Sequence, residues 1–510
     1  MKTALLALSL IGLASTSVWA ANYSWSGGGT PVGDQYLWSD KDNWSEGEVP
    51  PTGSTIYFRT AAGADILLTA PTSLTNIWFQ PLADLSGPAG SFTLSGAPIT
   101  ITNALGIQNQ SLSHQIINSD LIFAASGEST IRGFRYSNTA PLNLPGNITI
   151  NGNVTADNGI YFRADNGSVI TVNGSVAGTG GSAISAKTGG DSSGYVYLRG
   201  VNNIANLSVG AGRTYIDNAA AVNVGVGVHL NGDGAFLFMN GYDLEISSLT
   251  NDGSNNGRQR IYNGSDTKTI LTYNRSTTDQ VFTGNLSDAT ATNNANYTFV
   301  KKGSNTLTLA PVTTSTSSAG NYYTGGTIVQ EGTLLIDSPL SPNTAAGRGA
   351  IEVLSGATFG GDGYAVGAVT VEGTLRVGLG ESASGTLRLG GALTLDSDSI
   401  IELSLGADGA HSTLARTGTG VWTFDSNQQF TLVDFGMESG TYTGVITGLS
   451  SVVDTSGWVV TNPGLSATFT YNSGNIDLTI SVIPEPTTAM SLLAAAGVLA
   501  WSGTRRRKRD

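Results

Sequence analysis

One short stretch of the chain occurs twice, and this recurrence limits the possible folds more than any other feature. Residues 148–154 read Ile-Thr-Ile-Asn-Gly-Asn-Val, and residues 170–176 read Ile-Thr-Val-Asn-Gly-Ser-Val. Apolar and polar side chains alternate in both copies, as in half-buried strands, and the Asn-Gly pair that follows favours a bend because both residues accept positive φ. The offset from 148 to 170 is typical of one coil of a β-solenoid, in which stacked coils bury apolar edges that no coil can bury alone.

A second set of repeated segments supports the same fold. Gly332, Gly373 and Gly385 each precede a Thr and an alternating strand. Charged residues make up 12% of the chain, against about 25% in an ordinary globular protein, so the side chains that cover exposed helices are scarce. The chain has 68 Gly and no Cys, so strand ladders and packing must hold it together without disulfides. We therefore expect an all-β protein, and more specifically a right-handed parallel β-helix.

Part of the second set resembles a known repeat. Residues 302–309 read Lys-Gly-Ser-Asn-Thr-Leu-Thr-Leu, and residues 323–334 read Tyr-Thr-Gly-Gly-Thr-Ile-Val-Gln-Glu-Gly-Thr-Leu. Together they resemble the autotransporter-associated β-strand repeat, whose units build β-helical stalks of exported bacterial surface proteins. The resemblance covers 298–336 with weaker echoes to 405, although the Ser/Thr-rich connector 311–320 is longer than usual. It implies a repeat region over 298–415, between an N-terminal solenoid region at 21–297 and a C-terminal β region at 416–483.

The segment from Met1 to Ala20 has the organisation of a signal peptide. Lys2 precedes an apolar stretch from Ala4 to Ala14, and the segment ends in Val-Trp-Ala. Small side chains at such an exit are what a signal peptidase recognises. We predict cleavage between Ala20 and Ala21 and export by the Sec route.

The C-terminal segment 484–510 contains three signals in order. Pro484, Glu485 and Pro486 come first, an apolar run from Ala489 to Trp501 follows, and a basic stop then consists of Arg505, Arg506, Arg507, Lys508 and Arg509. This order resembles the PEP-CTERM sorting signal of exported proteins in Gram-negative bacteria, which implies a membrane-embedded exosortase as partner.

The tail has two alternative interpretations. A sortase signal requires Leu-Pro-x-Thr-Gly, which is absent here. The apolar run is short against the ~20 residues that span a bilayer, so a permanent single-pass anchor is the weaker alternative to transient insertion and processing. In either case the basic stop favours a cytoplasmic C-terminus and an exported body, which ends on the cell envelope, on the outer surface or outside the cell.

Without the two terminal segments, 18 basic and 35 acidic side chains remain, so the net charge of the body is near −17. Such a surface disfavours nucleic acid and anionic lipid, because phosphate binding needs clustered Lys and Arg. We predict no required cofactor, although weak Ca²⁺ binding is compatible with this charge. The Asp-Gly turns at 231–234 and 361–363 fit no EF-hand loop, and turn chemistry explains them.

Several features invite an enzymatic interpretation, but each has a simpler one. Ser192 lies in Gly-Asp-Ser-Ser-Gly, which matches a nucleophile elbow, yet its surroundings predict loop and strand instead of strand and helix. A polysaccharide lyase or hydrolase on a β-helix is the main alternative, with Arg163, Asp165 and Arg199 lying where a groove could form. No carboxylate cluster with recognisable ligand spacing accompanies them. No histidine has a second metal ligand at a zinc spacing; the three are His114, His229 and His411.

Aromatic residues are concentrated between 21 and 80, where four of the eight Trp occur. Large rings cover the open end of a solenoid well, so we expect an N-terminal cap. Stacking on a glycan is the alternative, with Trp38 and Trp44 as contacts. The sequence as a whole predicts a non-enzymatic exported β-solenoid with a structural or adhesive role, and an extracellular polysaccharide as the candidate partner.

Overall fold

The computed structural model describes residues 21–82, 89–134, 146–253, 258–288, 297–312, 320–338 and 344–482. Strands carry this part of the chain, and its only helical pieces are three short 3-10 turns: η1 (Lys41–Asn43), η2 (Thr179–Gly181) and η3 (Ala407–Gly409). The expected all-β class is therefore confirmed. No helix in the described ranges is long and apolar enough to cross a membrane. The predicted signal peptide and the sorting segment lie outside the described residues.

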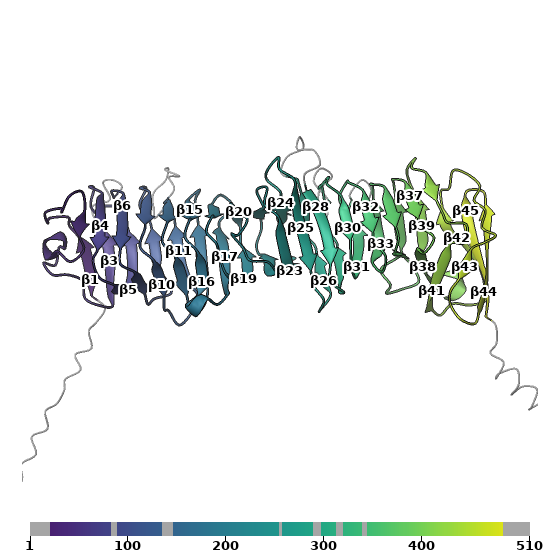
Figure 1. Cartoon of the computed structure of the whole chain (residues 1–510), viewed down its shortest axis with the longest axis horizontal. Coiled ribbons are helices and arrows are strands. Elements are labelled where there is room, and N and C mark those ends of the chain that lie inside the picture. Colours follow the sequence, from purple (N-terminus) through teal and green to yellow (C-terminus); the bar gives the residue numbers. More distant parts are fainter. Residues whose placement is uncertain are drawn as a thin grey trace, which may run out of the picture. The chain divides into compact units, whose positions relative to one another are not determined.

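The chain divides into two compact units, Met1–Ile184 and Ser185–Asp510. In the first unit, parallel strands lie side by side in stacks (Figure 1). Its strands are β1 (Asn22–Trp25), β2 (Tyr36–Leu37), β3 (Ser54–Phe58), β4 (Ala64–Leu68), β5 (Thr72–Phe79), β6 (Phe92–Gly96), β7 (Ile99–Ile101), β8 (Ile107–Asn109), β9 (Gln115–Ile117), β10 (Leu121–Phe123), β11 (Ser129–Gly133), β12 (Ile148–Ile150), β13 (Val154–Ala156), β14 (Ile160–Ala164), β15 (Val169–Val172) and β16 (Val176–Gly178).

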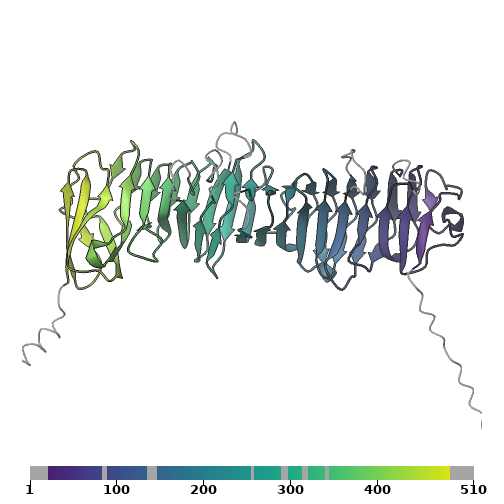
Figure 2. The same cartoon turned by 180° about the vertical axis from the view of Figure 1, so that it is seen from behind.

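The second unit is built in the same way, as the view from behind also shows (Figure 2). Its strands, of which the first begins at the boundary, are β17 (Ile184–Gly190), β18 (Tyr195–Leu198), β19 (Ile204–Val209), β20 (Gly212–Ile216), β21 (Val226–Leu230), β22 (Ala235–Phe238), β23 (Leu244–Asn251), β24 (Arg260–Tyr262), β25 (Thr269–Asn274), β26 (Gln280–Phe282), β27 (Asn285–Ser287), β28 (Tyr297–Lys302), β29 (Thr306–Leu309), β30 (Thr327–Val329), β31 (Thr333–Ser338), β32 (Ile351–Val353), β33 (Thr358–Ala365), β34 (Val369–Val371), β35 (Thr374–Val377), β36 (Thr386–Leu389), β37 (Leu393–Leu395), β38 (Ile400–Gly406), β39 (Thr413–Arg416), β40 (Trp422–Thr423), β41 (Gln429–Phe435), β42 (Gly440–Thr447), β43 (Val459–Val460), β44 (Leu465–Asn472) and β45 (Asn475–Val482).

The register confirms the coil length expected from the repeated stretch. Ile148 of β12 pairs with Ile170 of β15, and Val154 of β13 pairs with Val176 of β16, in parallel. Apolar side chains of successive coils thus lie directly above one another in the interior; Ile148, Ile170 and Val176 are fully buried. Long parallel sheets of this kind are consistent with a β-solenoid.

The second repeat set is split between two sheets. Thr358 of β33 pairs with both Thr333 of β31 and Thr374 of β35, so the segments after Gly332 and Gly373 share one sheet. The segment after Gly385 belongs to another, because Arg388 of β36 pairs with Tyr364, beyond the part of β33 that pairs with β35, and Thr386 pairs with Thr413. A similar sequence therefore serves two different faces of the coil.

The Asn-Gly pairs bend the chain for a reason that differs from the expected one. Neither Gly152 nor Gly174 has a positive φ. A Cβ on Gly174 would instead lie 1.9 Å from the carbonyl oxygen of Gly152, and one on Gly152 would lie 2.1 Å from that of Ser119. These glycines are required by the close approach of stacked backbones.

The last strands of the second unit depart from the parallel pattern. β45 pairs antiparallel with both β42 and β44. Phe469 of β44 lies over the buried Phe430 of β41, with 4.2 Å between ring centroids, and Trp458 lies against both rings. The antiparallel hairpin and this aromatic cluster cover the final parallel coil.

Candidate functional site

Trp38 and Trp44 belong to a packed aromatic cluster beside β1. Trp25 contacts Trp44 edge to face at 5.2 Å between ring centroids, and Trp44 contacts Trp38 at 4.7 Å. Trp44 Nε1 donates to the carbonyl of Trp38 at 2.9 Å. Because Trp38 is 4% and Trp44 2% exposed, neither ring has an open face on which a sugar could stack. Trp38 and Trp44, which the sequence offered as alternative glycan contacts, are therefore packing residues of this cluster.

Most of the predicted processing residues lie in the terminal segments of the chain. Ala20, the Pro484–Pro486 tripeptide and the basic stop at 505–509 lie outside the described residues, whereas Ala21 directly precedes β1.

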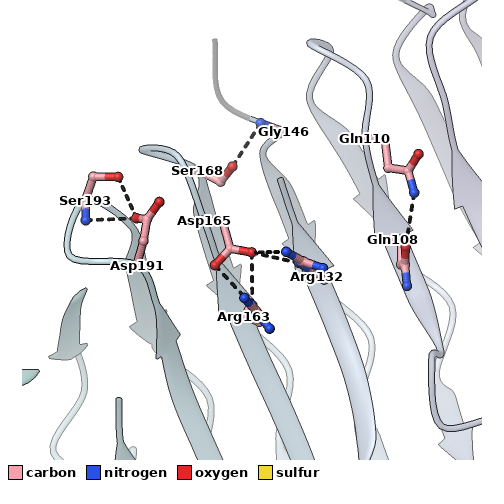
Figure 3. Close-up of polar contacts among 9 residues, drawn as sticks. All are labelled: Gln108, Gln110, Arg132, Gly146, Arg163, Asp165, Ser168, Asp191 and Ser193. Atoms are coloured by element: carbon pink, nitrogen blue, oxygen red, sulfur yellow. Dashed lines mark hydrogen bonds and ion pairs between the residues drawn. The ribbon is translucent and has the colours of Figure 1, made fainter. Parts of the chain in front are cut away.

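Ser192 lies in an exposed turn between β17 and β18. Asp191 Oδ1 accepts hydrogen bonds from the backbone N–H and the hydroxyl of Ser193, at 2.9 and 2.6 Å (Figure 3). The chain therefore leads from strand to strand through a side-chain-stabilised turn. The strand-to-helix geometry of a nucleophile elbow is not formed.

Asp165 joins two arginines on the outer side of β11 and β14 (Figure 3). Arg132 and Arg163 are paired in register on these strands. Asp165 Oδ2 accepts from Arg132 Nε at 2.7 Å and from Arg163 Nε at 2.9 Å. Asp165 is 5% exposed, so its carboxylate is enclosed by the two guanidinium groups. The arrangement is an ion-pair cluster that joins neighbouring coils.

The side chains around this cluster also bond to their own neighbours. Gln110 Nε2 donates to Gln108 Oε1 at 3.1 Å, and the Ser168 hydroxyl accepts from the backbone N–H of Gly146 at 3.0 Å (Figure 3).

The three histidines are held by hydroxyl or carbonyl groups. His114 contacts the Thr149 hydroxyl at 2.8 Å, His229 the Thr250 hydroxyl at 2.9 Å, and His411 the Gly409 carbonyl at 2.9 Å. Burial lowers the pKa of His114. Within the described ranges, no group of three or more His, Asp and Glu residues could hold a metal ion.

The strongest candidate surface lies on β18, β20, β22 and β24 of the second unit. Each strand carries two outward residues separated by one buried position, and all eight are half-buried. The parallel register aligns them in two columns. We call this surface the aromatic-arginine strip. Its first column is Tyr195, Arg213, Phe236 and Arg260; its second is Tyr197, Tyr215, Phe238 and Tyr262.

The second column is a continuous stack of rings. Ring centroids lie 4.7 Å apart between Tyr197 and Tyr215, 4.5 Å between Tyr215 and Phe238, and 4.9 Å between Phe238 and Tyr262. The interplanar angles are 15°, 9° and 15°. The rings pack face to face along the column because strand spacing nearly equals ring spacing. Their edges and hydroxyl groups therefore point outward.

The first column places two guanidinium groups among these rings. Arg213 Nη1 donates to the Tyr195 hydroxyl at 3.2 Å, and Arg260 Nη1 donates to the Tyr262 hydroxyl at 3.0 Å. Among the described residues, neither Arg213 nor Arg260 forms an ion pair. The strip thus carries positive charge that no described carboxylate neutralises.

One edge of the strip is electrically balanced. Arg199 Nε bonds Asp217 Oδ2 at 2.7 Å, and Asp217 Oδ1 accepts from Asn240 Nδ2 at 2.6 Å. Arg199, which the lyase hypothesis singled out, is therefore paired. Burial raises the pKa of Tyr197 and of Tyr215, so both phenols keep their protons at neutral pH.

The sequence interpretation missed this strip although a signal was present. The motifs Tyr-Val-Tyr, Arg-Thr-Tyr, Phe-Leu-Phe and Arg-Ile-Tyr begin at 195, 213, 236 and 260. Alternating aromatic or Arg residues around one apolar residue would have revealed it. A search for a fixed period could not, because the steps between paired positions, 195 to 213, 213 to 236 and 236 to 260, are unequal.

No known family model matches this chain, and no curated protein matches it either.

Proposed function

We propose that this protein is an exported, non-enzymatic right-handed β-solenoid that has a structural or adhesive role in the cell envelope or the extracellular matrix. Its C-terminal segment 484–510 would act as a sorting signal for an exosortase-type enzyme, with transient insertion in the inner membrane before processing. The solenoid body would then act at the outer surface or outside the cell.

The aromatic-arginine strip is the observation that carries the adhesive part of this proposal. Four successive coils of one sheet present aligned, half-buried side chains outward. A ladder of this kind offers the same chemistry at regular steps, which suits an extended partner such as a polysaccharide better than a small molecule. The enclosed Asp165 and the turn at Ser192 offer no comparable arrangement for catalysis.

Cell fractionation combined with mass spectrometry tests the export and sorting steps. We expect a surface-located or released form that begins at Ala21 and lacks 505–510. A surface form that retains the peptide 505–510 would contradict processing and favour the single-pass anchor.

A screen of the purified protein against a panel of polysaccharides tests the non-enzymatic role. We expect retention on at least one polysaccharide without release of shorter products. Sustained turnover would replace the proposal with the alternative of a polysaccharide lyase or hydrolase on the same scaffold.

A further inference from the structure

The aromatic-arginine strip presents hydrogen-bond donors to the solvent. An arginine side chain has hydrogen-bond donors and no acceptor. The guanidinium groups of Arg213 and Arg260, which form no ion pair with a described residue, each lie beside a phenol. The hydroxyl groups of Tyr195 and Tyr262 already accept a bond from Arg213 and Arg260. Neither hydroxyl donates to a described residue, and the same holds for Tyr197 and Tyr215. A partner must therefore supply acceptors.

The stacked second column disfavours the usual mode of sugar recognition. A sugar that stacks on an aromatic side chain needs an open ring face, but the inner rings Tyr215 and Phe238 are covered on both faces by their neighbours. Along the inner part of the second column, the ring edges and the Tyr215 hydroxyl remain for contact, beside the guanidinium groups of the first column. Recognition at this strip must rest on polar contacts and charge.

The spacing and sign of the charge indicate an extended anion. Arg213 and Arg260 lie on β20 and β24, with β22 between them. At about 4.8 Å per strand, their backbones are roughly 10 Å apart along the sheet. In an extended polyuronate, carboxylates on one side of the chain recur at every second sugar, a step of similar length. Charge-assisted bonds from Arg to carboxylates are among the strongest polar contacts that a partly exposed surface can form.

We propose that the aromatic-arginine strip binds a linear uronate polysaccharide whose chain crosses β18, β20, β22 and β24. Arg213 and Arg260 bind carboxylates on alternate sugars, and the hydroxyl groups of Tyr195 and Tyr262 donate to adjacent oxygens. The ring stack holds the donors rigidly, so little side-chain freedom is lost on binding. This inference rests on the proposed adhesive function and names its ligand class.

Titration of the full-length protein with polygalacturonate at low and moderate salt tests this assignment, with dextran and single-stranded DNA as comparison ligands. We expect binding to polygalacturonate that weakens with salt, and much weaker binding to the other two. Arg213→Gln and Arg260→Gln should each weaken binding by about tenfold, because each removes one charge-assisted contact. Tyr262→Phe should weaken it less, since the ring stack is kept.

Arg348→Gln is the matched control. Arg348, like Arg213 and Arg260, lies near a tyrosine ring, 4.3 Å from the centroid of Tyr322, but it is exposed and lies outside the strip. This variant should bind as the wild type does, and melting curves of all variants should show that the fold is intact.

Three results would overturn the inference. If the Arg213→Gln/Arg260→Gln double variant binds polygalacturonate like the wild type, another face is the adhesive one and the proposed function survives. Equal binding of dextran or DNA would show that uronate carboxylates are not what the strip recognises. The protein could also be surface-located and retained on another polysaccharide, yet fail to bind polygalacturonate. That result would refute the uronate ligand and leave the proposed adhesive function in place.

Discussion

Asp288 and Tyr297 place two unpartnered oxygen atoms in the interior of the second unit. Asp288 Oδ2 accepts from the backbone N–H and hydroxyl of Thr324, at 3.1 and 2.7 Å, but Oδ1 is buried without a partner among the described residues. The Tyr297 hydroxyl is equally unpartnered within the described ranges. Burial raises the pKa of Asp288, and burial with nearby Tyr323 and Asp288 raises that of Tyr297. The carboxylate is thus a destabilising charge at neutral pH.

Asp288→Asn should raise the free energy of unfolding at pH 7 by roughly 1 kcal/mol, because it removes the buried charge and keeps an acceptor for Thr324. A raised pKa in the folded state means that the wild type loses stability as the pH rises above the ordinary carboxyl value of 3.8. The advantage of the variant should therefore vanish near pH 3. Urea unfolding at pH 7 and at pH 3 measures the stability difference between Asp288→Asn and the wild type. The control Asp288→Ala, which removes the acceptor for Thr324, should be less stable than the wild type at both pH values. A less stable Asn variant at pH 7 would show that the charge is required.

Lys301 is a buried residue of β28 that bonds to three carbonyl groups. Its Nζ donates to the carbonyls of Lys302, Gly303 and Glu331 at 2.9, 2.6 and 3.1 Å. Lys301→Met should lower the free energy of unfolding by about 2–4 kcal/mol, because one buried and two part-buried hydrogen bonds are lost. Lys302→Met, on the half-buried neighbour, should be nearly neutral. Equal stability of the two variants in urea unfolding would contradict this role.

The same lysine gives a pH dependence of opposite sign to that of Asp288. Burial lowers the pKa of Lys301 from 10.5 to about 8. Between these values the unfolded chain binds more protons than the folded protein, so this group adds stability as the pH rises. The stability difference between wild type and Lys301→Met should therefore grow from pH 7.5 to about pH 10. A difference that stays constant over this range would show that the ammonium is equally protonated in both states.

At the scale of elements, the Asn-Gly segments work as a ladder across coils. Asn151 Nδ2 donates to Asn118 Oδ1, and Asn173 Nδ2 donates to Asn151 Oδ1, both at 2.7 Å. Directly after these asparagines, Gly152 and Gly174 allow the stacked backbones to touch. The asparagine side chains form hydrogen bonds between coils, and the glycines allow the backbones of those coils to come close enough for these bonds.

Gly174→Ala should therefore be strongly destabilising, by roughly 1–3 kcal/mol or more, since the new methyl group would meet the backbone of Gly152 and cannot move away. Gly127→Ala is the control, because no atom lies within 4 Å of its added Cβ and its φ is not positive. This second change should stay within about 0.5 kcal/mol of the wild type. Thermal melting measures both, and a Gly174→Ala protein as stable as the control would contradict the close approach.

These elements also show how far the sequence predicts the structure. Alternation and the recurrence of the stretch at 148 and 170 predict the strands and the register of β12 with β15, because an in-register stack requires similar residues one coil apart. The aromatic-arginine strip was not predicted, because loops of different length make its coils unequal. Trp38 and Trp44 were predicted as possible sugar contacts because composition shows that aromatics gather, but not whether their faces are open.

At the scale of the whole molecule, one aromatic cluster lies beside the first strand of the first unit, and another covers the last parallel coil of the second unit. The sequence predicted such a cap near residues 21–80 from its four tryptophans. The corresponding cluster in the second unit consists of Phe430, Trp458 and Phe469. It could not be predicted from composition, because Phe430 meets Trp458 through the parallel pairing of β41 with β43, and Phe469 joins them from the antiparallel hairpin of β44 and β45. Capping matters because an open edge of a parallel sheet is a template for another chain.

A chain that ends at Asn462 should therefore associate, whereas a chain that ends at Val482 should not. The shorter form lacks β44 and β45, which removes the antiparallel partner of β42 and uncovers the rings of Phe430 and Trp458. We expect oligomers or aggregates by size-exclusion chromatography with light scattering, at concentrations at which the longer form elutes as one species. Phe469→Ala in the full chain, which keeps both strands and loses only the ring, should lower the melting temperature without association. If the shorter form stays monomeric with an unchanged melting temperature, the hairpin is dispensable and the parallel coils tolerate an open edge.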